Sequence, residues 1–324
     1  MSSVPPSPVT PVTPIKVLVI TLGGERRARM ERMFASPNLL DPATGRPLFD
    51  VSFTPGVVSR ELRSKPGMMR EAYDCGLLTE DPQTTFFAGK RGKQKGLWPD
   101  MDYAEELWRK GRSLNRERSV LACLMAHLKA MREAVEGGYD VILEDNVRIL
   151  DSPESYQVMR SFIAKAGTSG VRYFGYLGPR DNLEWLYDKH LPRYAPDEAP
   201  FPFTEHYNGE EVRGTSLWGA YAYMVSKEAY DAILKKLQED IGAVMWKGKR
   251  MKTYRIKPID KIVPRRCHEA GAGAVMIVHK PVFFRAPMLQ SKIHRKFDAE
   301  FCKSTDLQLK AVGLEWEGLW LTEE

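Results

Sequence analysis

The sequence lacks the features of a membrane-spanning or disulfide-rich protein. It contains no run of about 18 uninterrupted apolar residues, the length that a spanning helix needs, so we expect no transmembrane segment. Its four cysteines, Cys75, Cys123, Cys267 and Cys302, stand far apart without a CxxC pair. This spacing indicates neither a zinc site nor a dense disulfide framework, and a reducing compartment is the plainer interpretation.

Signals of secretion are also missing. The N-terminal sequence MSSVPPSPVTPVTP has neither the basic start nor the apolar segment of an export signal, and the chain has no Asn-x-Ser/Thr sequon. We therefore expect a cytoplasmic protein. The formal net charge of +6, from 48 basic and 42 acidic residues, is a mild excess that favours anionic ligands such as nucleotides without implying nucleic acid.

The composition is that of a folded protein with irregular segments. With 324 residues, 43% of them hydrophobic, the chain is long enough for a packed core. Residues 1–14 are rich in Pro, Ser and Thr and are expected to form a disordered tail. We expect a single domain over residues 15–300, with a C-terminal extension at 301–324. Residues 61–112 show no clear period and are interpreted as an insertion or lid within the domain.

The start of the domain has the pattern of an α/β unit. Residues Ile15–Leu22, IKVLVITL, form a nearly continuous apolar run that predicts a buried strand. Gly23 and Gly24 predict a turn, and the basic segment after them has the apolar spacing of an amphipathic helix. A short strand is predicted next, at Phe49–Phe53. Strand, glycine turn and helix together form the opening unit of an α/β fold.

The segment Val141–Val147, VILEDNV, is the most informative for function. Its branched apolar residues predict a strand buried on both faces, and Glu144, Asp145 and Asn146 follow at the carboxyl end of that strand. Open parallel sheets bind ligands at this end. Clustered oxygen ligands suit a hard divalent cation, which often accompanies a phosphate-bearing ligand. The alternative is that Asp145 and Asn146 only form the turn after the strand.

Later patterns complete the predicted sheet and its helices. Apolar residues three and four apart predict a helix from Ser119 to Val135, closed by Gly137 and Gly138. Further strands are predicted at Val171–Gly178, Ala220–Val225 and Ala274–Pro281. Ser226 is expected to cap a helix after the second of these strands.

Several short blocks, taken in order, resemble a known family. They are Thr21-Leu22 with Glu25-Arg26-Arg27, Ser119-Val120-Leu121-Ala122-Cys123 with Ala126-His127, Leu143-Glu144-Asp145-Asn146, Leu177-Gly178, Gly214-Thr215 with Tyr221 or Tyr223, and Pro258-Ile259-Asp260. By these blocks the chain resembles the family 25 glycosyltransferases, which include lipooligosaccharide galactosyltransferases and collagen galactosyltransferases. The resemblance runs over roughly residues 15–291 and is weakest between 61 and 112.

The chain departs from the family pattern at four positions. Thr21 stands where the family has Asn, and Val120 stands where it has an acidic residue. Ala126 replaces a Ser, and Asn146 replaces the last Asp of the Glu-Asp-Asp block. Loss of that acid lowers the charge available to a metal, which bears on activity, metal dependence and the choice of donor.

The resemblance implies a GT-A-like Rossmannoid mixed sheet, flanked by helices, that uses Mn²⁺ or Mg²⁺ and a UDP-sugar donor. A hexose, galactose or glucose, would be transferred with inversion to a glycan or protein hydroxyl acceptor. The metal would act as a Lewis acid on the leaving diphosphate, with Asp145 and Asn146 as its oxygen ligands. The residues implied in donor binding are Thr21, Leu22, Arg26, Arg27, Glu144, Asp145, Asn146, Gly214 and Thr215.

Several of these residues have a second interpretation. Asp260 is predicted as the base that takes the proton of the acceptor hydroxyl, but Asp is also common as a helix cap. Arg26 and Arg27 begin a helix, where backbone N–H groups favour a diphosphate, or they form a solvated charged face. His127 lies on the apolar stripe of its helix and is either a hydrogen-bonded core residue or part of the site. Glu144 either contacts the ligand or bonds to the scaffold.

Two other functions compete with sugar transfer. Asn146 and the changed second block allow a catalytically weakened relative that serves as a binding or scaffold protein. The basic segments 89–96 and 247–257 allow nucleic-acid association, although no RNA- or DNA-binding motif is present and no specific nucleic acid is expected. The sequence favours an enzyme, a nucleotide-sugar-dependent hexosyltransferase.

Overall fold

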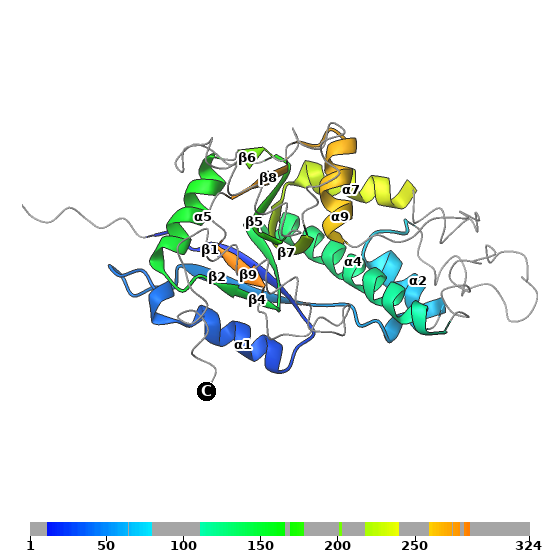
Figure 1. The fold of residues 1–324 in the computed structure, drawn as a ribbon, viewed down its shortest axis with the longest axis horizontal. Helices are drawn as coiled ribbons and strands as arrows, with labels where there is room; N and C mark the ends of the chain where they lie inside the picture. The colour runs from blue at the N-terminus through cyan, green and yellow to red at the C-terminus, as the bar shows by residue number, and fades with distance from the viewer. Residues whose placement is uncertain are drawn as a thin grey trace, which may run out of the picture.

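The computed structural model describes residues 12–63, 65–79, 111–165, 169–177, 201–202, 218–239, 259–273, 275–278 and 282–285 (Figure 1). The strands are β1 (Ile15–Thr21), β2 (Phe49–Pro55), β3 (Val141–Glu144), β4 (Val147–Ile149), β5 (Val171–Leu177), β6 (Phe201–Pro202), β7 (Trp218–Val225), β8 (Val275–Ile277) and β9 (Phe283–Arg285). The helices are α1 (Glu25–Phe34), α2 (Lys65–Asp74), α4 (Gly111–Gly137), α5 (Pro153–Lys165), α7 (Lys227–Leu237) and α9 (Ile259–Glu269), with short 3-10 helices η1 (Pro37–Leu39) and η2 (Glu61–Arg63).

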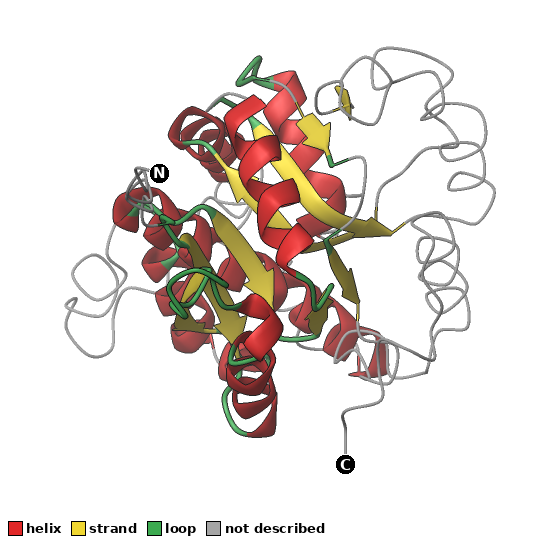
Figure 2. Ribbon diagram, turned by 90° about the vertical axis from the view of Figure 1, so that its left-hand side faces the viewer, coloured by secondary structure: helices red, strands yellow, loops and turns green. Residues whose placement is uncertain are grey.

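A mixed sheet forms the centre of the described structure. Its seven strands have the order β2-β1-β3-β7-β5-β8-β6. Strands β2, β1 and β3 run parallel, β7 is antiparallel to both β3 and β5, and β8 is parallel to β5. Strands β4 and β9 pair in a separate two-stranded sheet. Helices flank the central sheet (Figure 2), so the mixed α/β class expected from the sequence is confirmed.

Each face of the central strands packs against a different set of helices. Side chains alternate along a strand, so consecutive residues point to opposite faces. In β1, Val17 and Val19 join a buried cluster with residues of α1 and α5, whereas Leu18 and Ile20 join a cluster with residues of α2, α4, α7 and α9. We call these faces the α1 side and the α4 side. Figure 1 shows the corresponding helices on the two sides of the sheet.

The strand order reverses beside β1. From β1 the chain passes through α1 to β2 at one edge, and it then returns through α2 and α4 to β3 on the other side of β1. The carboxyl ends of the parallel strands β1 and β3 are therefore adjacent, with α1 and α4 on opposite faces. Open α/β sheets bind ligands outside the carboxyl ends of strands at such a reversal.

Local geometry at the end of β1 depends on two glycines. Gly23 and Gly24 both have positive φ values, 79° and 62°, in the region that residues with a Cβ rarely adopt. The chain turns sharply there, and α1 begins directly beyond the strand, as the sequence pattern predicted.

The cap at Ser226 is also confirmed, because its side chain accepts a hydrogen bond from the backbone N–H of Ala229 at 3.1 Å.

Two elements differ from the sequence expectation. Helix α4 was predicted from Ser119 but begins at Gly111, since its first turns are polar and show no apolar period. Helix α2 lies within residues 61–112, which were interpreted as an insertion or lid. Its Met69 and Ala72 are fully buried in the same cluster as α4, so this described part of the segment belongs to the core.

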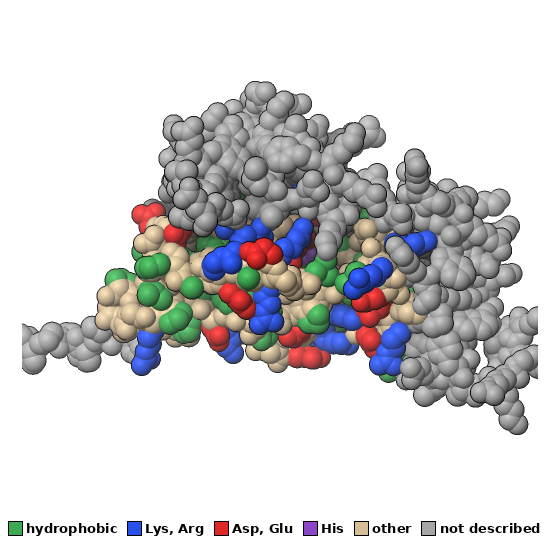
Figure 3. Space-filling view, turned by 90° about the horizontal axis from the view of Figure 1, so that it is seen from below, with side chains coloured by type: hydrophobic (Ala, Val, Ile, Leu, Met, Phe, Trp, Pro, Cys, Tyr) green, Lys and Arg blue, Asp and Glu red, His purple; other side chains and the backbone are tan. Residues whose placement is uncertain are grey.

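Several expectations concern parts of the chain that the structure does not describe. Most of the expected tail, residues 80–110 and the extension at 301–324 lie outside the described residues. The basic segments 89–96 and 247–257 lie there as well. On the face seen in Figure 3, the described Lys and Arg side chains are mixed with acidic ones. Within the described ranges, no helix is both long enough and apolar enough to cross a membrane.

Candidate functional site

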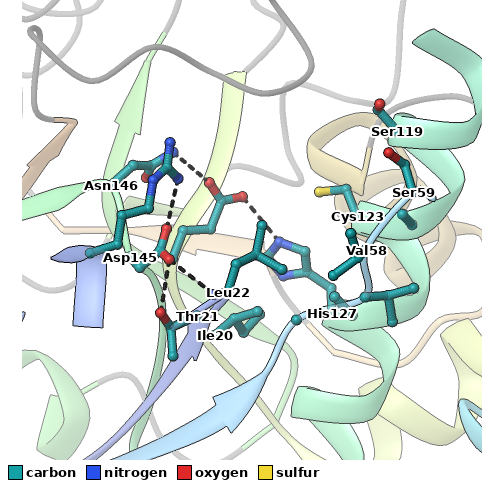
Figure 4. A pocket seen from close by; sticks show the side chains of 16 residues that line it. Ile20, Thr21, Leu22, Val58, Ser59, Ser119, Cys123, His127, Asp145 and Asn146 are labelled. Atoms are coloured by element: carbon teal, nitrogen blue, oxygen red, sulfur yellow. Dashed lines mark hydrogen bonds and ion pairs between the residues drawn. The ribbon is translucent and has the colours of Figure 1, made fainter. Parts of the chain in front are cut away.

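A pocket lies at the point where the strand order reverses (Figure 4). It encloses about 790 Å³ of space, part of it open to solvent. Residues 20–22, 56–59 and 144–146 line it from the ends of β1, β2 and β3. Arg26 lines it from α1, and Cys123 and His127 are among the residues that line it from α4. The pocket thus occupies the edge of the sheet at which the strand pattern predicted a ligand site.

Adjacent residues at the end of β3 point to opposite sides of the sheet. Leu143 belongs to the buried cluster on the α1 side, and Ile142 belongs to the cluster on the α4 side. By the same alternation, Asp145 continues the α1 side and Glu144 continues the α4 side. Thr21, at the end of β1, also lies on the α1 side, next to Asp145. The two carboxylates of the Glu-Asp-Asn block therefore have separate surroundings.

Asp145 connects three elements on the α1 side. Its Oδ2 accepts hydrogen bonds from Thr21 Oγ1 at 2.9 Å and from the backbone N–H of Leu22 at 3.2 Å. Its Oδ1 pairs with Arg26 Nη1 at 3.0 Å, and its backbone carbonyl accepts a hydrogen bond from Arg29. Asp145 is only 6% exposed, and a buried carboxylate needs such partners to offset its lost hydration. It therefore ties β1, α1 and β3 together.

The two arginines predicted to bind the donor point in different directions. Arg26 lines the pocket, with 24% of its side chain exposed. Arg27 does not line the pocket; it pairs with Glu31 at 2.9 Å and lies over the ring of Phe53 at 4.6 Å. Arg29 was not identified from the sequence. It is buried and lies three residues after Arg26, on the same face of α1. This three-residue spacing on the helix was the signal that could have identified Arg29.

On the α4 side, His127 bridges two residues of the sheet. Its Nδ1 lies 2.8 Å from the hydroxyl of Tyr223 in β7, and its Nε2 lies 3.1 Å from Glu144 Oε1. His127 is only 1% exposed, yet it lines the pocket. The two interpretations of His127 are therefore compatible, because it is a hydrogen-bonded core residue with one edge at the site. Glu144 likewise bonds to the scaffold while lining the pocket.

The neighbours of Glu144 keep it ionised. Burial alone would raise its pKa, but the hydrogen bond and charge of His127, the charge of Arg285 and a hydrogen bond from Asn146 bring the pKa below the ordinary value of 4.5. Asn146 Nδ2 donates to Glu144 Oε2 at 2.9 Å. Arg285 reaches the site because it pairs with Val147 across β4 and β9, a long-range contact that carries no local sequence signal.

Cys123 lies one helical turn before His127 and faces the same pocket (Figure 4). Its Sγ, a ring nitrogen of His127 and a carboxylate oxygen of Glu144 all lie within 4.8 Å of one another. Burial, followed by the charges of Glu144 and Asp260, raises the pKa of the Cys123 thiol well above its ordinary value of 9.0. The thiol on its own is therefore neutral at physiological pH.

The predicted metal ligands are not equally open. Both carboxylate oxygens of Asp145 already accept hydrogen bonds or pair with Arg26. Asn146 Oδ1 is buried and has no hydrogen-bond partner among the described residues. Hard cations such as Mg²⁺ take about six oxygen ligands. Asp145 and Asn146 therefore supply only part of such a ligand set. Asn146 offers an oxygen without a described partner, and Asp145 would offer a second oxygen if Arg26 moved away from it.

The remaining predicted residues contribute less to the described site. Asp260 stands in the first turn of α9 and does not line the pocket, although its charge reaches Cys123. An acid in the first turn of a helix is also favourable for the helix itself, so both interpretations of Asp260 stay predictions. Gly214 and Thr215 lie outside the described residues.

Comparison with known proteins found no matching family model, no matching curated protein and no matching solved structure.

Proposed function

We propose that the chain is a nucleotide-sugar-dependent glycosyltransferase that moves a hexose from a UDP-sugar to a hydroxyl acceptor. The observation that carries the proposal is the position of the pocket, at the carboxyl ends of β1 and β3 where the strand order reverses. Nucleotides bind at this position in open α/β sheets. The resemblance of Leu143–Asn146 and its neighbouring blocks to the family 25 glycosyltransferases supports a sugar nucleotide as the ligand.

The α1 side of the pocket suits the diphosphate of such a donor. The guanidinium of Arg26 lines it, and the first backbone N–H groups of α1 have no intrahelical partners. Within the described structure, α1 has no side-chain cap that would occupy those groups. A phosphate would compete with Asp145 for Arg26 and form charge-assisted hydrogen bonds with it. In the transfer step, the same contacts stabilise the charge that develops on the leaving UDP.

Mn²⁺ or Mg²⁺ is part of this proposal, with Asp145 and Asn146 as the residues that would hold it. A divalent ion supplies Lewis-acid stabilisation of the leaving diphosphate. Oδ1 of Asp145 would become available when Arg26 contacts the diphosphate, and Oδ1 of Asn146 has no hydrogen-bond partner among the described residues. Asp260, which does not line the described pocket, is the proposed base for the acceptor hydroxyl.

A matched pair of arginine variants tests the proposal. UDP with Mn²⁺ should raise the melting temperature of the wild type and of Arg27→Ala, because Arg27 does not line the pocket. Arg26→Ala should lose most of this response. A donor screen across UDP-, GDP- and CMP-sugars, with and without Mn²⁺, should detect hydrolysis or transfer with UDP-hexoses. Absence of both a thermal response and turnover for every donor would contradict the proposal.

A weakened relative that binds without turnover is a second candidate. It is favoured by the carboxylate of Asp145, whose oxygens are all engaged by protein groups, and by the uncharged Asn146 beside it. Asn146→Asp discriminates the two functions. Donor hydrolysis that is already measurable in the wild type and changes little in the variant indicates an active enzyme. Hydrolysis that is found only in the variant indicates the binding protein.

A further inference from the structure

Three chemically different side chains meet on the α4 side of the pocket. Cys123 Sγ, a ring nitrogen of His127 and a carboxylate oxygen of Glu144 all lie within 4.8 Å of one another. Cys123 and His127 are four residues apart on α4 and therefore share one helical face. Glu144 reaches them from the end of β3, and Figure 4 shows Cys123 and His127 projecting from α4 toward the pocket.

The contact between His127 and Glu144 requires a proton or a cation between its two atoms. Nε2 and Oε1 are 3.1 Å apart, and a carboxylate oxygen only accepts. Either a proton on Nε2 or a cation shared by both atoms makes this distance favourable. In the metal-free site Nε2–H donates to Glu144; when a metal ion takes the place of that proton, Nδ1–H can donate to the Tyr223 hydroxyl, which lies 2.8 Å away. Metal-bound histidines are commonly oriented by a partner on the other ring nitrogen in this way.

The donor set identifies the class of ion. One thiolate, one imidazole and one carboxylate suit a borderline transition metal such as Zn²⁺, whereas Mg²⁺ prefers oxygen ligands throughout. Two anionic ligands and a divalent ion give zero net charge, which limits the cost of placing them in a partly buried site. All three residues line the pocket, so a further coordination position faces its interior. Three protein ligands with one open position are typical of zinc sites that act on a bound water or substrate.

We propose that Cys123, His127 and Glu144 form a binding site for Zn²⁺ or a similar transition-metal ion, with its open coordination position toward the pocket. On binding, the thiol of Cys123 and any proton on Nε2 of His127 are released to solvent. The site goes beyond the proposed sugar transfer and does not depend on it. Its ligands differ from Asp145 and Asn146, the residues of the proposed hard-cation position, although Asn146 donates a hydrogen bond to Glu144 at 2.9 Å.

Cobalt substitution tests the site in the full-length protein without any nucleotide. After treatment with a chelator, the wild type should bind one equivalent of Co²⁺ and show thiolate-to-metal charge-transfer absorption in the near ultraviolet. Zn²⁺ should displace the Co²⁺ and abolish that absorption. Cys123→Ser should lose the charge-transfer absorption, and His127→Gln should weaken binding at least tenfold. Cys75→Ala is the control, because Cys75 is a buried thiol that does not line the pocket.

Circular dichroism and a cooperative melting curve establish first that each variant is folded. If a variant does not fold, the wild-type spectrum still decides the question. Absence of charge-transfer absorption at one equivalent of Co²⁺ overturns the proposal, as does unchanged absorption in a folded Cys123→Ser variant. Because UDP and sugar donors are absent from this experiment, its failure is distinguishable from a failure of the proposed glycosyltransferase activity.

Discussion

Two neighbouring residues at the end of β3, Glu144 and Asp145, belong to different chemical environments. Asp145 faces the α1 side, where Arg26, Thr21 and a backbone N–H satisfy its carboxylate. Glu144 faces the α4 side, where it meets the imidazole of His127 and lies near a thiol. The pleat of one strand thus gives a single pocket one wall with the guanidinium of Arg26 and an opposite wall with a thiol, an imidazole and a carboxylate.

This difference would separate the two ligands proposed for the pocket, a diphosphate and a transition-metal ion. A diphosphate needs positive groups and backbone N–H donors, which are found on the α1 side. A transition-metal ion needs ligands that lose their protons on binding, and the α4 side brings a thiol, an imidazole and a carboxylate within 4.8 Å of one another. Each wall can be disrupted by a variant that leaves the other wall intact.

The largest effect is expected from Asp145→Ala. The substitution removes the acceptor of Thr21 and Leu22 and the partner of Arg26, so β1, α1 and β3 lose their common contact. We expect the free energy of unfolding to fall by about 3 kcal/mol, measured by urea denaturation. Asp151→Ala is the control, because Asp151 is exposed and should change stability by less than about 0.5 kcal/mol. Equal losses in both variants would show that Asp145 has no special connecting role.

His127→Ala should have the next largest effect and act on the α4 side alone. It leaves the Tyr223 hydroxyl and one Glu144 oxygen without their described partner and creates a small cavity. We expect a loss of about 2 kcal/mol in the free energy of unfolding, whereas the exposed helix residue Glu133 should tolerate Ala within about 0.5 kcal/mol. The thermal response to UDP should persist. Its disappearance in folded His127→Ala would mean that the two walls act as one.

Tyr223→Phe is a milder test of the same wall. It removes only the hydroxyl that orients the His127 ring, so the expected loss of stability is about 1 kcal/mol. Co²⁺ affinity should fall by about 10- to 100-fold, because the orienting partner of a ligand is lost while the ligand remains. An unchanged Co²⁺ affinity, measured by spectrophotometric titration, would show that Tyr223 packs without positioning His127.

The smallest effect concerns acid stability. The pKa of Glu144 is lowered in the folded state, so its contribution to stability is present above the ordinary value of 4.5 and is lost as the pH falls through the folded pKa. In chelator-treated protein, Glu144→Gln should therefore show a smaller drop in melting temperature between neutral pH and pH values below 4.5 than the wild type. A larger drop in melting temperature for Glu144→Gln than for the wild type would show that ionised Glu144 does not stabilise the fold.

Local patterns made much of the fold predictable. The continuous apolar runs of β1 and β3, the glycine turn at Gly23 and the cap at Ser226 each depend on residues close in sequence. The first turns of α4 escaped prediction because residues 111–117 are polar or glycine except for Leu114, so the sequence there shows no amphipathic period. The placement of α2 in the core escaped for a related reason: its buried stripe is short and is interrupted by charged residues.

The site was only partly predictable, because most of its contacts are long-range. Strand ends identified Glu144, Asp145 and Asn146, and helix position identified Arg26. The contrary directions of Glu144 and Asp145 follow from strand alternation, but their partners depend on sheet order and on α4 packing. The spacing of the cysteines gave no sign of the proposed zinc site. Its ligands come from a helix and a strand that are apart in the sequence, and only one of them is a cysteine.

Crystals of the full chain grown with UDP and Zn²⁺, measured at the zinc absorption edge, test the separation of the two walls most directly. We expect an anomalous peak bounded by Cys123, His127 and Glu144, together with diphosphate density at Arg26 beside the start of α1. An anomalous peak between Asp145 and Asn146, with none at His127 and no nucleotide at Arg26, would show that the two walls do not bind these ligands separately.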